Sequence, residues 1–368
     1  IMSKNIYFSD LFCGAGGISL GFLKAGLKPA LASDFWDKSE LNFKLNKNLK
    51  KIKFLNRDLG KKENILLISK LVKNIDILAG GPPCQGFSTL GKRKKNDMRN
   101  LLVDNFLKII KLSRPKVIVM ENVPGLKSMR KKNGTKYLDF IKNYLKKENY
   151  TYEEIMLDGK YFKMAQARKR VFFVGFNHKF YDKKIIDKFK LNFEKITKKK
   201  LNYSNIDTKI KDLPKIKSGQ GKQILNYKSK KIFNHESFVH GDELLEKLKY
   251  VKPNGGLLDV PRRLLNSHLK NMVDGKYGSG GFIKNIYGRL DWKKPAGTVV
   301  AGIRKITCGR FIHPDFNRLL TPRECARLQG FSDNYLFHGS ITDQYTLIGN
   351  SVPPIFAYHL ATIIKKSI

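Results

Sequence analysis

Residues 6–17 read Ile-Tyr-Phe-Ser-Asp-Leu-Phe-Cys-Gly-Ala-Gly-Gly, and this stretch decides the fold class. Ile6 to Leu11 predicts a buried strand, and the glycines that follow predict a tight turn before a helix from Ile18 to Ala25. Glycines in such a turn let the backbone approach a nucleotide-like ligand closely. The stretch differs from the dinucleotide motif G-x-G-x-x-G, so it indicates a nucleotide-like site without identifying the ligand.

Strand and helix patterns continue to alternate over the first ~175 residues, the size of one α/β domain. Short apolar segments at 30–33, 75–79 and 117–120 predict strands, and helical patterns cover 101–112 and 137–147. This alternation predicts an α/β fold with a mostly parallel, Rossmann-like sheet covered by helices on both faces. Ligands in such folds bind at the carboxyl ends of the strands.

The character of the chain changes after Gly175. Residues 176–250 are rich in Lys and Asn with weak periodicity, and residues 251–312 carry glycine clusters. With 368 residues in all, the chain is long enough for a second lobe, which we expect to be smaller and loop-rich. We expect the Lys-rich segment 183–200 to be solvated surface, and we expect helices at 321–329 and near 354–366.

The composition indicates a polyanionic partner. Lys and Arg number 72 against 31 Asp and Glu, a net charge of +41. Such an excess neutralises phosphates, although a compositional bias toward Lys explains part of it. No apolar run is long enough to span a membrane, and no secretory signal is visible, so we expect a cytoplasmic protein with reduced thiols. The four cysteines form no C-x-x-C pair, so we expect no metal site.

The strongest chemical motif is Gly-Gly-Pro-Pro-Cys-Gln-Gly-Phe-Ser at 80–88. It follows a predicted strand, so Cys84 lies on a loop at the carboxyl end of the sheet. Two prolines stiffen the approach to the thiol, and residues 91–100 are dense in Lys and Arg. This setting suits a nucleophilic cysteine; the alternative is a buried structural thiol.

Other polar residues follow the predicted strands. Glu121 ends the strand after the Cys84 loop, and Asp34 ends the second strand beside Phe35 and Trp36. Because alternate residues of an extended chain point the same way, we expect the polar side chains of segment 166–170 to share one face. They are Gln166, Arg168 and Arg170.

Across nearly its whole length, the sequence resembles the DNA (cytosine-5)-methyltransferase family. The resemblance rests on eight motifs in family order: DLFCGAGG, SDFW, RDL at 57–59, GGPPCQGFS, ENVPG, QARKR, RLLTPRECARLQGF at 318–331 and GNSVPP at 349–354. It implies a catalytic S-adenosylmethionine-binding domain at 1–178, a target-recognition domain at 179–338, and a C-terminal helix at 339–368 that returns to the catalytic domain.

The resemblance also implies residue roles. Cys84 would attack C6 of a flipped-out cytosine, Glu121 would contact N3 and the 4-amino group, Arg168 would contact O2, and Arg170 would position the site. One set of residues would bind S-adenosylmethionine, with Asp34 on the ribose and Asp58 on the adenine: Phe12, Gly14, Gly16, Gly17, Asp34, Phe35, Trp36, Asp58, Leu59, Pro82, Asn350 and Ser351.

Double-stranded DNA is the expected partner, and we hypothesise that two loops of the second lobe read its bases. These loops are 275–289, with Arg289, and about 301–310, with Arg304; arginine pairs well with guanine. The alternative is that both arginines bind phosphates. The full set of expected DNA contacts is Gln85, Ser88, Lys92, Arg93, Gln166, Arg289, Thr298 and Arg304.

Three other functions compete with this hypothesis. A tRNA methyltransferase of the same family is disfavoured because the second lobe lacks a Cys-Phe-Thr motif, and an inactive paralogue is disfavoured by intact Cys84, Glu121 and Arg168. A redox enzyme would need a partner cysteine or a dinucleotide motif. We expect a monomer. The sequence leaves open whether the protein belongs to a restriction-modification system, is an orphan enzyme or comes from a phage. In a restriction-modification system, a cognate restriction endonuclease would be its functional partner.

Overall fold

The computed structural model describes residues 5–83, 101–131, 133–198, 201–276 and 283–368. They divide into two compact units. The first unit comprises residues 1–161, 169–200 and 351–368, and the second comprises residues 162–168 and 201–350. The chain therefore passes between the units four times, and its last helix belongs to the same unit as its first strand.

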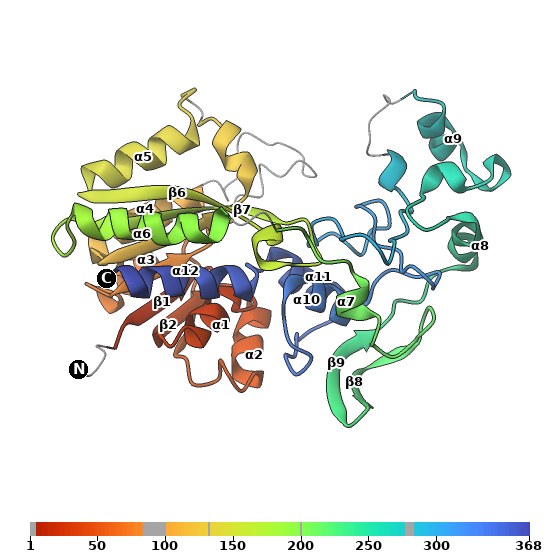
Figure 1. Cartoon of the computed structure of the whole chain (residues 1–368), viewed down its shortest axis with the longest axis horizontal. Helices are drawn as coiled ribbons and strands as arrows, with labels where there is room; N and C mark the ends of the chain where they lie inside the picture. Colours follow the sequence, from red (N-terminus) through yellow and green to blue (C-terminus); the bar gives the residue numbers. More distant parts are fainter. Residues whose placement is uncertain (1–4, 84–100, 132, 199–200, 277–282) are drawn as a thin grey trace. The chain divides into compact units, whose positions relative to one another are not determined.

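A seven-stranded sheet forms the centre of the first unit, in the order β3-β2-β1-β4-β5-β7-β6 (Figure 1). Strands β1 to β5 run parallel, and β7 runs antiparallel between β5 and β6. The strands are β1 (Tyr7–Leu11), β2 (Lys28–Asp34), β3 (Phe54–Asn56), β4 (Ile77–Gly80), β5 (Val117–Asn122), β6 (Tyr150–Asp158) and β7 (Lys169–Asn177). This topology confirms the predicted mostly parallel α/β fold.

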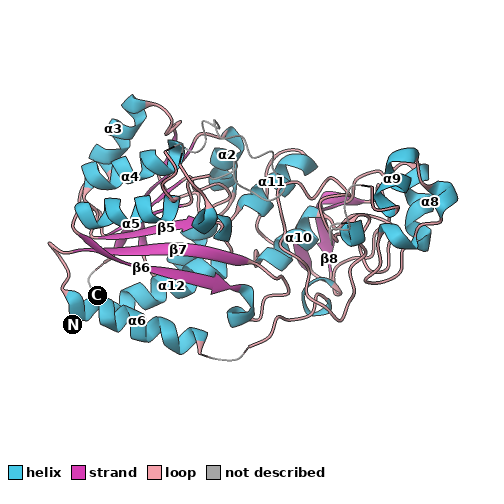
Figure 2. Ribbon diagram, turned by 90° about the horizontal axis from the view of Figure 1, so that it is seen from above, coloured by secondary structure: helices cyan, strands magenta, loops and turns pink. Residues whose placement is uncertain are grey.

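Helices cover both faces of this sheet (Figure 2). Helices α3, α4 and α5 pack on one face, and α1, α6 and α12 pack on the other. The helices of the unit are α1 (Gly17–Lys24), α2 (Asp37–Leu45), α3 (Lys62–Leu71), α4 (Leu101–Ser113), α5 (Tyr137–Lys147), α6 (Lys183–Thr197) and α12 (Pro354–Ser367). Elements α2, α3, β3 and β6 were not predicted from the sequence, because their short or charged segments give a weak hydrophobic period.

Helix α6 corrects the expectation that residues 183–200 are only solvated surface. Ile186 and Phe189 are buried, and the Phe189 ring meets the Phe176 ring edge-on at 5.4 Å. Apolar residues that recur once per turn bury one stripe of the helix while its lysines stay in water. The high lysine content concealed this stripe in the sequence.

Helix α12 packs against α1 within the first unit. A Cβ added at Gly21 of α1 would lie 2.5 Å from Cβ of Ala357, so the helices touch through their backbones. Residues 341–367, which include α12, are apolar enough and long enough to cross a membrane, but 67% of their apolar 18-residue stretch is buried in the fold. This burial is typical of core helices.

The second unit contains less regular structure. A hairpin pairs β8 (Gly221–Tyr227) with β9 (Lys230–Glu236). The helices are α7 (Asp207–Ile210), α8 (Asp242–Tyr250), α9 (Ser267–Val273), α10 (Pro322–Gln329) and α11 (Ile341–Asn350). This unit also contains the short 3₁₀ turns η5 (Leu257–Asp259), η6 (Arg262–Leu264) and η7 (Ile283–Asn285). Two further 3₁₀ turns come earlier in the chain, η3 (Pro124–Ser128) and η4 (Gly159–Phe162).

Helix α10 confirms the prediction for residues 321–329. Thr321 Oγ1 accepts from the backbone N–H of Glu324 at 3.2 Å, and Glu324 Oε2 accepts from the N–H of Thr321 at 2.7 Å. This capping box, with Pro322 in the first turn, starts the helix, and Gly330 ends it at φ 94°. The hairpin was not predicted, because its alternating pattern is mostly polar.

Candidate active site

A strained turn stands at the carboxyl end of β1. Phe12, Gly14 and Gly16 adopt φ values of 56°, 51° and 72°, so every second residue is left-handed. The backbone N–H of Cys13 donates to the Ser33 carbonyl at 3.2 Å, which holds the turn against β2. A left-handed phenylalanine costs free energy, and such strain concentrates at binding sites.

The glycines of this turn serve different purposes. A Cβ at Gly17 would lie 2.0 Å from the Val352 carbonyl O and 2.6 Å from Ser351 Oγ, and one at Gly16 would lie 2.7 Å from Leu49. A Cβ at Gly14 would meet no described atom within 4 Å. Gly16 and Gly17 therefore permit close packing, whereas the space above Gly14 is open to a ligand.

Asp34 joins the ends of β1 and β2. Its Oδ2 accepts from the N–H of Gly14 at 2.9 Å, and its Oδ1 accepts from the N–H of Trp36 at 3.0 Å. Burial raises the pKa of Asp34, and these backbone donors oppose the rise. Phe35 beside it is 64% exposed, so an aromatic face is available next to the turn.

Asp10 is a buried residue to which the sequence analysis gave no role. Its Oδ2 accepts from Ser19 Oγ at 2.7 Å and from the Ser19 N–H at 3.1 Å, near the start of α1. Its Oδ1 has no hydrogen-bond partner among the described residues. Burial raises the pKa of Asp10 to about 7, and nearby Asp34 contributes to the rise.

The remaining expected ligand contacts lie on several elements. Asp58, after β3, is exposed, and its Oδ1 accepts from the Gly60 N–H at 2.7 Å. Leu59 and Pro82 are buried after β3 and β4, and Ser351 is buried in the first unit. Asn350 ends α11 in the second unit and is exposed. Apart from Asn350, the expected ligand contacts thus belong to the unit that holds the turn.

Glu121 and Arg170 form an ion pair at the same end of the sheet, where the parallel strands have their carboxyl ends. Arg170 Nε lies 2.9 Å from Glu121 Oε1, and each side chain is 12% exposed. Burial lowers the pKa of Arg170, whereas Glu121 raises it. Because β7 runs antiparallel to β5, the start of β7 meets the end of β5. Sequence spacing gave no sign of this pairing.

Arg168 and Gln166 belong instead to the second unit, which corrects the expectation that they share one face with Arg170. Arg168 is fully buried, and it donates to the carbonyls of Val299 at 2.8 Å and Gly349 at 3.0 Å. The side-chain amide of Gln166 is buried and bonded to Leu328 and Gln329. The irregular backbone at 166–168 breaks the strand period, so only Arg170 reaches Glu121.

Several expected site residues lie outside the described residues. They are Cys84, Gln85, Ser88, Lys92 and Arg93, together with the glycines at 278–281. The described chain before this gap ends at Pro83. A Cβ added at Gly81 would lie 3.1 Å from Glu121 Oε2, so the start of the Cys84 loop passes directly against that carboxylate.

Arg289 corrects the base-reading hypothesis. It is 5% exposed, and its guanidinium donates to the carbonyls of Val251, Leu248 and His313 at 2.7, 2.7 and 2.8 Å. A guanidinium bound to buried carbonyls is not available to a base or a phosphate. Thr298 Oγ1 donates to the Ala167 carbonyl at 2.6 Å, whereas Arg304 is exposed. Of the two arginines, Arg304 alone presents its side chain to solvent.

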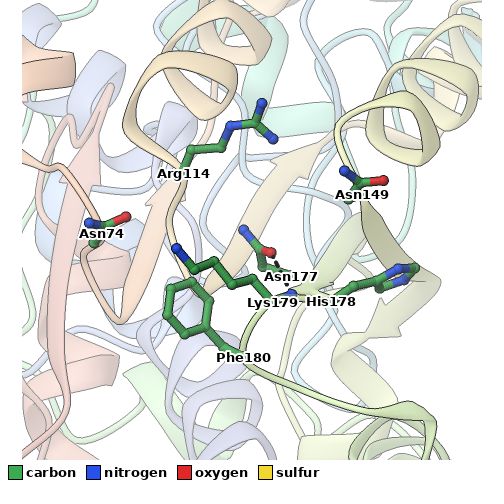
Figure 3. Close-up of a pocket in the computed structure, with 7 residues that line it drawn as sticks. All are labelled: Asn74, Arg114, Asn149, Asn177, His178, Lys179 and Phe180. Carbon is green, nitrogen blue, oxygen red and sulfur yellow. Dashed lines mark hydrogen bonds between the residues drawn. The ribbon is translucent and has the colours of Figure 1, made fainter.

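A pocket of about 430 Å³ lies at the opposite end of the sheet, away from the carboxyl ends of the parallel strands (Figure 3). Its lining residues Asn74 and Arg114 precede β4 and β5, and Asn177 ends the antiparallel β7. This end holds the amino ends of the parallel strands, where ligands of such folds are not expected. Arg114 is paired with Glu148 at 3.3 Å, so we assign the pocket a structural role. Within the described ranges, no three His, Cys, Asp or Glu side chains form a group that could hold a metal.

Comparison with known proteins places these features in a family. The family model described as C-5 cytosine-specific DNA methylase matches residues 6–366. Type II methyltransferase M.DdeI of Desulfomicrobium norvegicum is 32% identical over 96% of this chain and 86% of its own. Type II methyltransferase M1.HphI of Haemophilus parahaemolyticus is 31% identical over 100% and 88%.

A solved structure shares the fold. It is described as a prophage-encoded DNA modification methyltransferase (E. coli), and it matches with a TM-score of 0.69 at 22% identity, covering 98% of this chain and 99% of that one. At this identity the match shows the fold alone.

Proposed function

This chain belongs to the C-5 cytosine-specific DNA methylase family and is a sequence-specific DNA methyltransferase, and from that premise we propose which residues carry out the reaction. Cys84 is the nucleophile, Glu121 and Arg170 act on the cytosine ring, and the turn at 12–17 holds the methyl donor. The observation that carries this assignment is the Glu121–Arg170 ion pair, which lies against Gly81 where the Cys84 loop begins.

The chemistry explains why these groups belong together. Cytosine C5 is too weakly nucleophilic to accept a methyl group directly. Addition of the Cys84 thiolate to C6 converts the ring to an enamine that is nucleophilic at C5. Glu121 bonds N3 and the 4-amino group, which stabilises the adduct. Bound S-adenosylmethionine would supply the methyl group that C5 accepts. The C5 proton is then lost and Cys84 is eliminated as the C6–S bond breaks, which gives 5-methylcytosine.

Arg170, rather than Arg168, is proposed to stabilise charge on the cytosine ring. Negative charge develops near O2 when the thiolate adds, and a guanidinium beside Glu121 is placed to stabilise it. Arg168 donates to two backbone carbonyls of the second unit, so its role is to fix that backbone. None of this chemistry is possible within stacked bases, so the cytosine must flip out of the duplex.

The family uses S-adenosylmethionine, and the residues of the first unit fit that cofactor. Among the described residues, Gly14 faces open space and Oδ1 of buried Asp10 has no hydrogen-bond partner, and both features suit a cationic nucleoside ligand. Bound S-adenosylmethionine supplies an electrophilic methyl group. Asp34 is proposed to bind its ribose, Phe35 and Trp36 its adenine, and Asp58 the adenine amino group. Ser351 and Asn350 are proposed for the methionine end.

DNA is the substrate of this family. Arg304 is the remaining candidate for base reading, and Lys92 and Arg93 are candidates for phosphate contacts. The relatives' Type II names favour a restriction-modification role with a cognate endonuclease. We further propose a monomer that works in the cytoplasm on the bacterial nucleoid.

The decisive experiment targets Cys84. Cys84→Ala should abolish methylation, measured by bisulfite sequencing of DNA from expressing cells, because no other group supplies the thiolate. Duplex DNA with 5-fluorocytosine at the target should trap the unsubstituted protein covalently, since fluorine blocks the final proton loss. An adduct on Cys13, Cys308 or Cys325, or trapping by tRNA in preference to duplex DNA, would show the assignment to be wrong.

A further inference from the structure

Asn122 connects the two loops that carry the reactive groups. It ends β5 immediately after Glu121 and is 2% exposed. Its Nδ2 donates to the Pro82 carbonyl at 3.2 Å, across 40 residues of sequence, and its Oδ1 accepts from the Val123 N–H at 2.9 Å. One buried amide therefore fixes a carbonyl just before Cys84 and the chain just after Glu121.

The chain that leads to Pro82 has little freedom on its other sides. A Cβ at Gly80 would lie 2.8 Å from the Leu11 carbonyl O, and one at Gly81 would lie 3.1 Å from Glu121 Oε2. Pro82 is buried and has no N–H to donate. Its buried carbonyl needs a donor, and Asn122 supplies it. The direction in which the chain leaves Pro82 toward Pro83 thus depends on this bond.

We propose that Asn122 is a positioning residue, which holds the Pro82 carbonyl so that the Cys84 thiol and the Glu121 carboxylate meet the same cytosine. The inference rests on the proposed roles of Cys84 and Glu121. Asn122 itself does not touch the base. A displacement of about 1 Å between reacting groups lowers a rate on the order of 100-fold, so one bond at this point controls the addition step.

The alternative is that Asn122 only stabilises the sheet, and the chain offers a matched control in Asn177. Asn177 ends β7 at the opposite end of the sheet and is 4% exposed. Its Nδ2 donates to the Pro115 carbonyl at 3.4 Å and to the Tyr150 hydroxyl at 3.3 Å. Its Oδ1 accepts from the Lys179 N–H at 3.0 Å, the bond drawn in Figure 3. The same substitution at both positions therefore removes an amide donor from a proline carbonyl. At Asn122 that bond is near the reaction, and at Asn177 it is at the opposite end of the sheet.

The experiment compares Asn122→Asp with Asn177→Asp. An aspartate keeps the acceptor but loses the donor to the proline carbonyl. The rate of covalent trapping is measured on 5-fluorocytosine duplex DNA at saturating DNA and S-adenosylmethionine. Asn122→Asp should slow trapping about 30- to 100-fold with KM for DNA within about 3-fold, whereas Asn177→Asp should change the rate less than about 3-fold.

Asn122→Ala serves as a second variant, because it removes the donor without burying a charge, and it should slow trapping by a similar factor. Equal rates for the Asn122 and Asn177 variants, or a raised KM at an unchanged rate, would overturn the inference. So would a failure of both Asn122 variants to fold while Asn177→Asp folds. Failure of the proposed function is distinguished by Cys84→Ala, which in that case would still methylate DNA.

Discussion

The two units bury different kinds of side chain. Among the largest fully buried side chains, the phenylalanines, such as Phe8 and Phe106, belong to the first unit, whereas the three arginines and Tyr345 belong to the second. These arginines are Arg168, Arg318 and Arg323. The first unit pairs most of its buried backbone in a sheet, so few of its carbonyls need a side-chain donor, and short amides such as Asn122 serve those that do. The second unit has long irregular segments, and their buried carbonyls need side-chain donors.

Arginine is suited to this task because its guanidinium carries five N–H donors in one plane. Arg323 donates through Nε to the Phe233 carbonyl at 2.6 Å and through Nη1 to the Ser332 carbonyl at 2.6 Å. Arg318 donates to the Ile216 carbonyl at 2.8 Å and forms a two-bond ion pair with Glu324. Loop geometry in the second unit is thus fixed by single residues, whereas the sheet is fixed by many.

The largest expected effect follows from removing one such arginine. Arg289→Ala should lower the free energy of unfolding of the second unit by about 4 kcal/mol, because several buried carbonyls lose their donor. Urea unfolding measures this through Trp292 fluorescence in a Trp36→Phe background, since the chain has one tryptophan in each unit. Exposed Arg304→Ala is the control and should change stability by less than about 0.5 kcal/mol. Equal effects of the two substitutions would show that the buried carbonyls of the second unit do not depend on Arg289.

A second prediction concerns pH. Burial lowers the pKa of His313 from 6.5 to about 4, against the raising effect of Glu324, so His313 is neutral in the folded unit. The unfolded chain binds a proton below pH 6.5, so the stability present at neutral pH is lost as pH falls. The second unit should lose about 2 kcal/mol from this residue between pH 7.5 and 5.

His313→Gln tests this sign. The variant should show a smaller loss of stability between pH 7.5 and 5, again by Trp292 fluorescence. Asp10 in the first unit acts in the opposite direction, because its raised pKa favours the folded, protonated form at low pH. The two unfolding transitions should therefore separate on acidification. An unchanged pH dependence in His313→Gln would show that this histidine is not responsible.

The smallest effect is expected in the sheet. Ile118 lies on β5, which pairs with β4 and β7. It is fully buried in the core that the sheet forms with α3 to α5. Ile118→Val should lower the free energy of unfolding of the first unit by about 1 kcal/mol, since one methylene is lost among many contacts. Trp36 fluorescence in a Trp292→Phe background measures it. A loss as large as that of Arg289→Ala would mean that the sheet also depends on single residues.

The sequence was most informative where local patterns and structure coincide. The turn at 12–17, the strands β1, β4 and β5, and the helix at 321–329 were predicted from adjacent residues. Helix α6 was missed because its apolar stripe is diluted by lysine, and the β8–β9 hairpin was missed because its strands carry few apolar residues. Arg289 was misinterpreted because an arginine in a glycine-rich segment is expected to be exposed. The carbonyls that bind its buried guanidinium belong to residues 24 to 41 positions away, so local sequence does not reveal them.

The sequence by itself determined the fold class, the family and the order of the reactive motifs, because each is encoded in short runs of neighbouring residues. Only the tertiary structure decided which arginine stands beside Glu121, that Asn122 holds Pro82, and that Arg289 is structural. These pairings join residues that are distant along the chain. Which side chains meet there depends on strand register and on which buried carbonyls lack donors, and neither property can be read from local spacing.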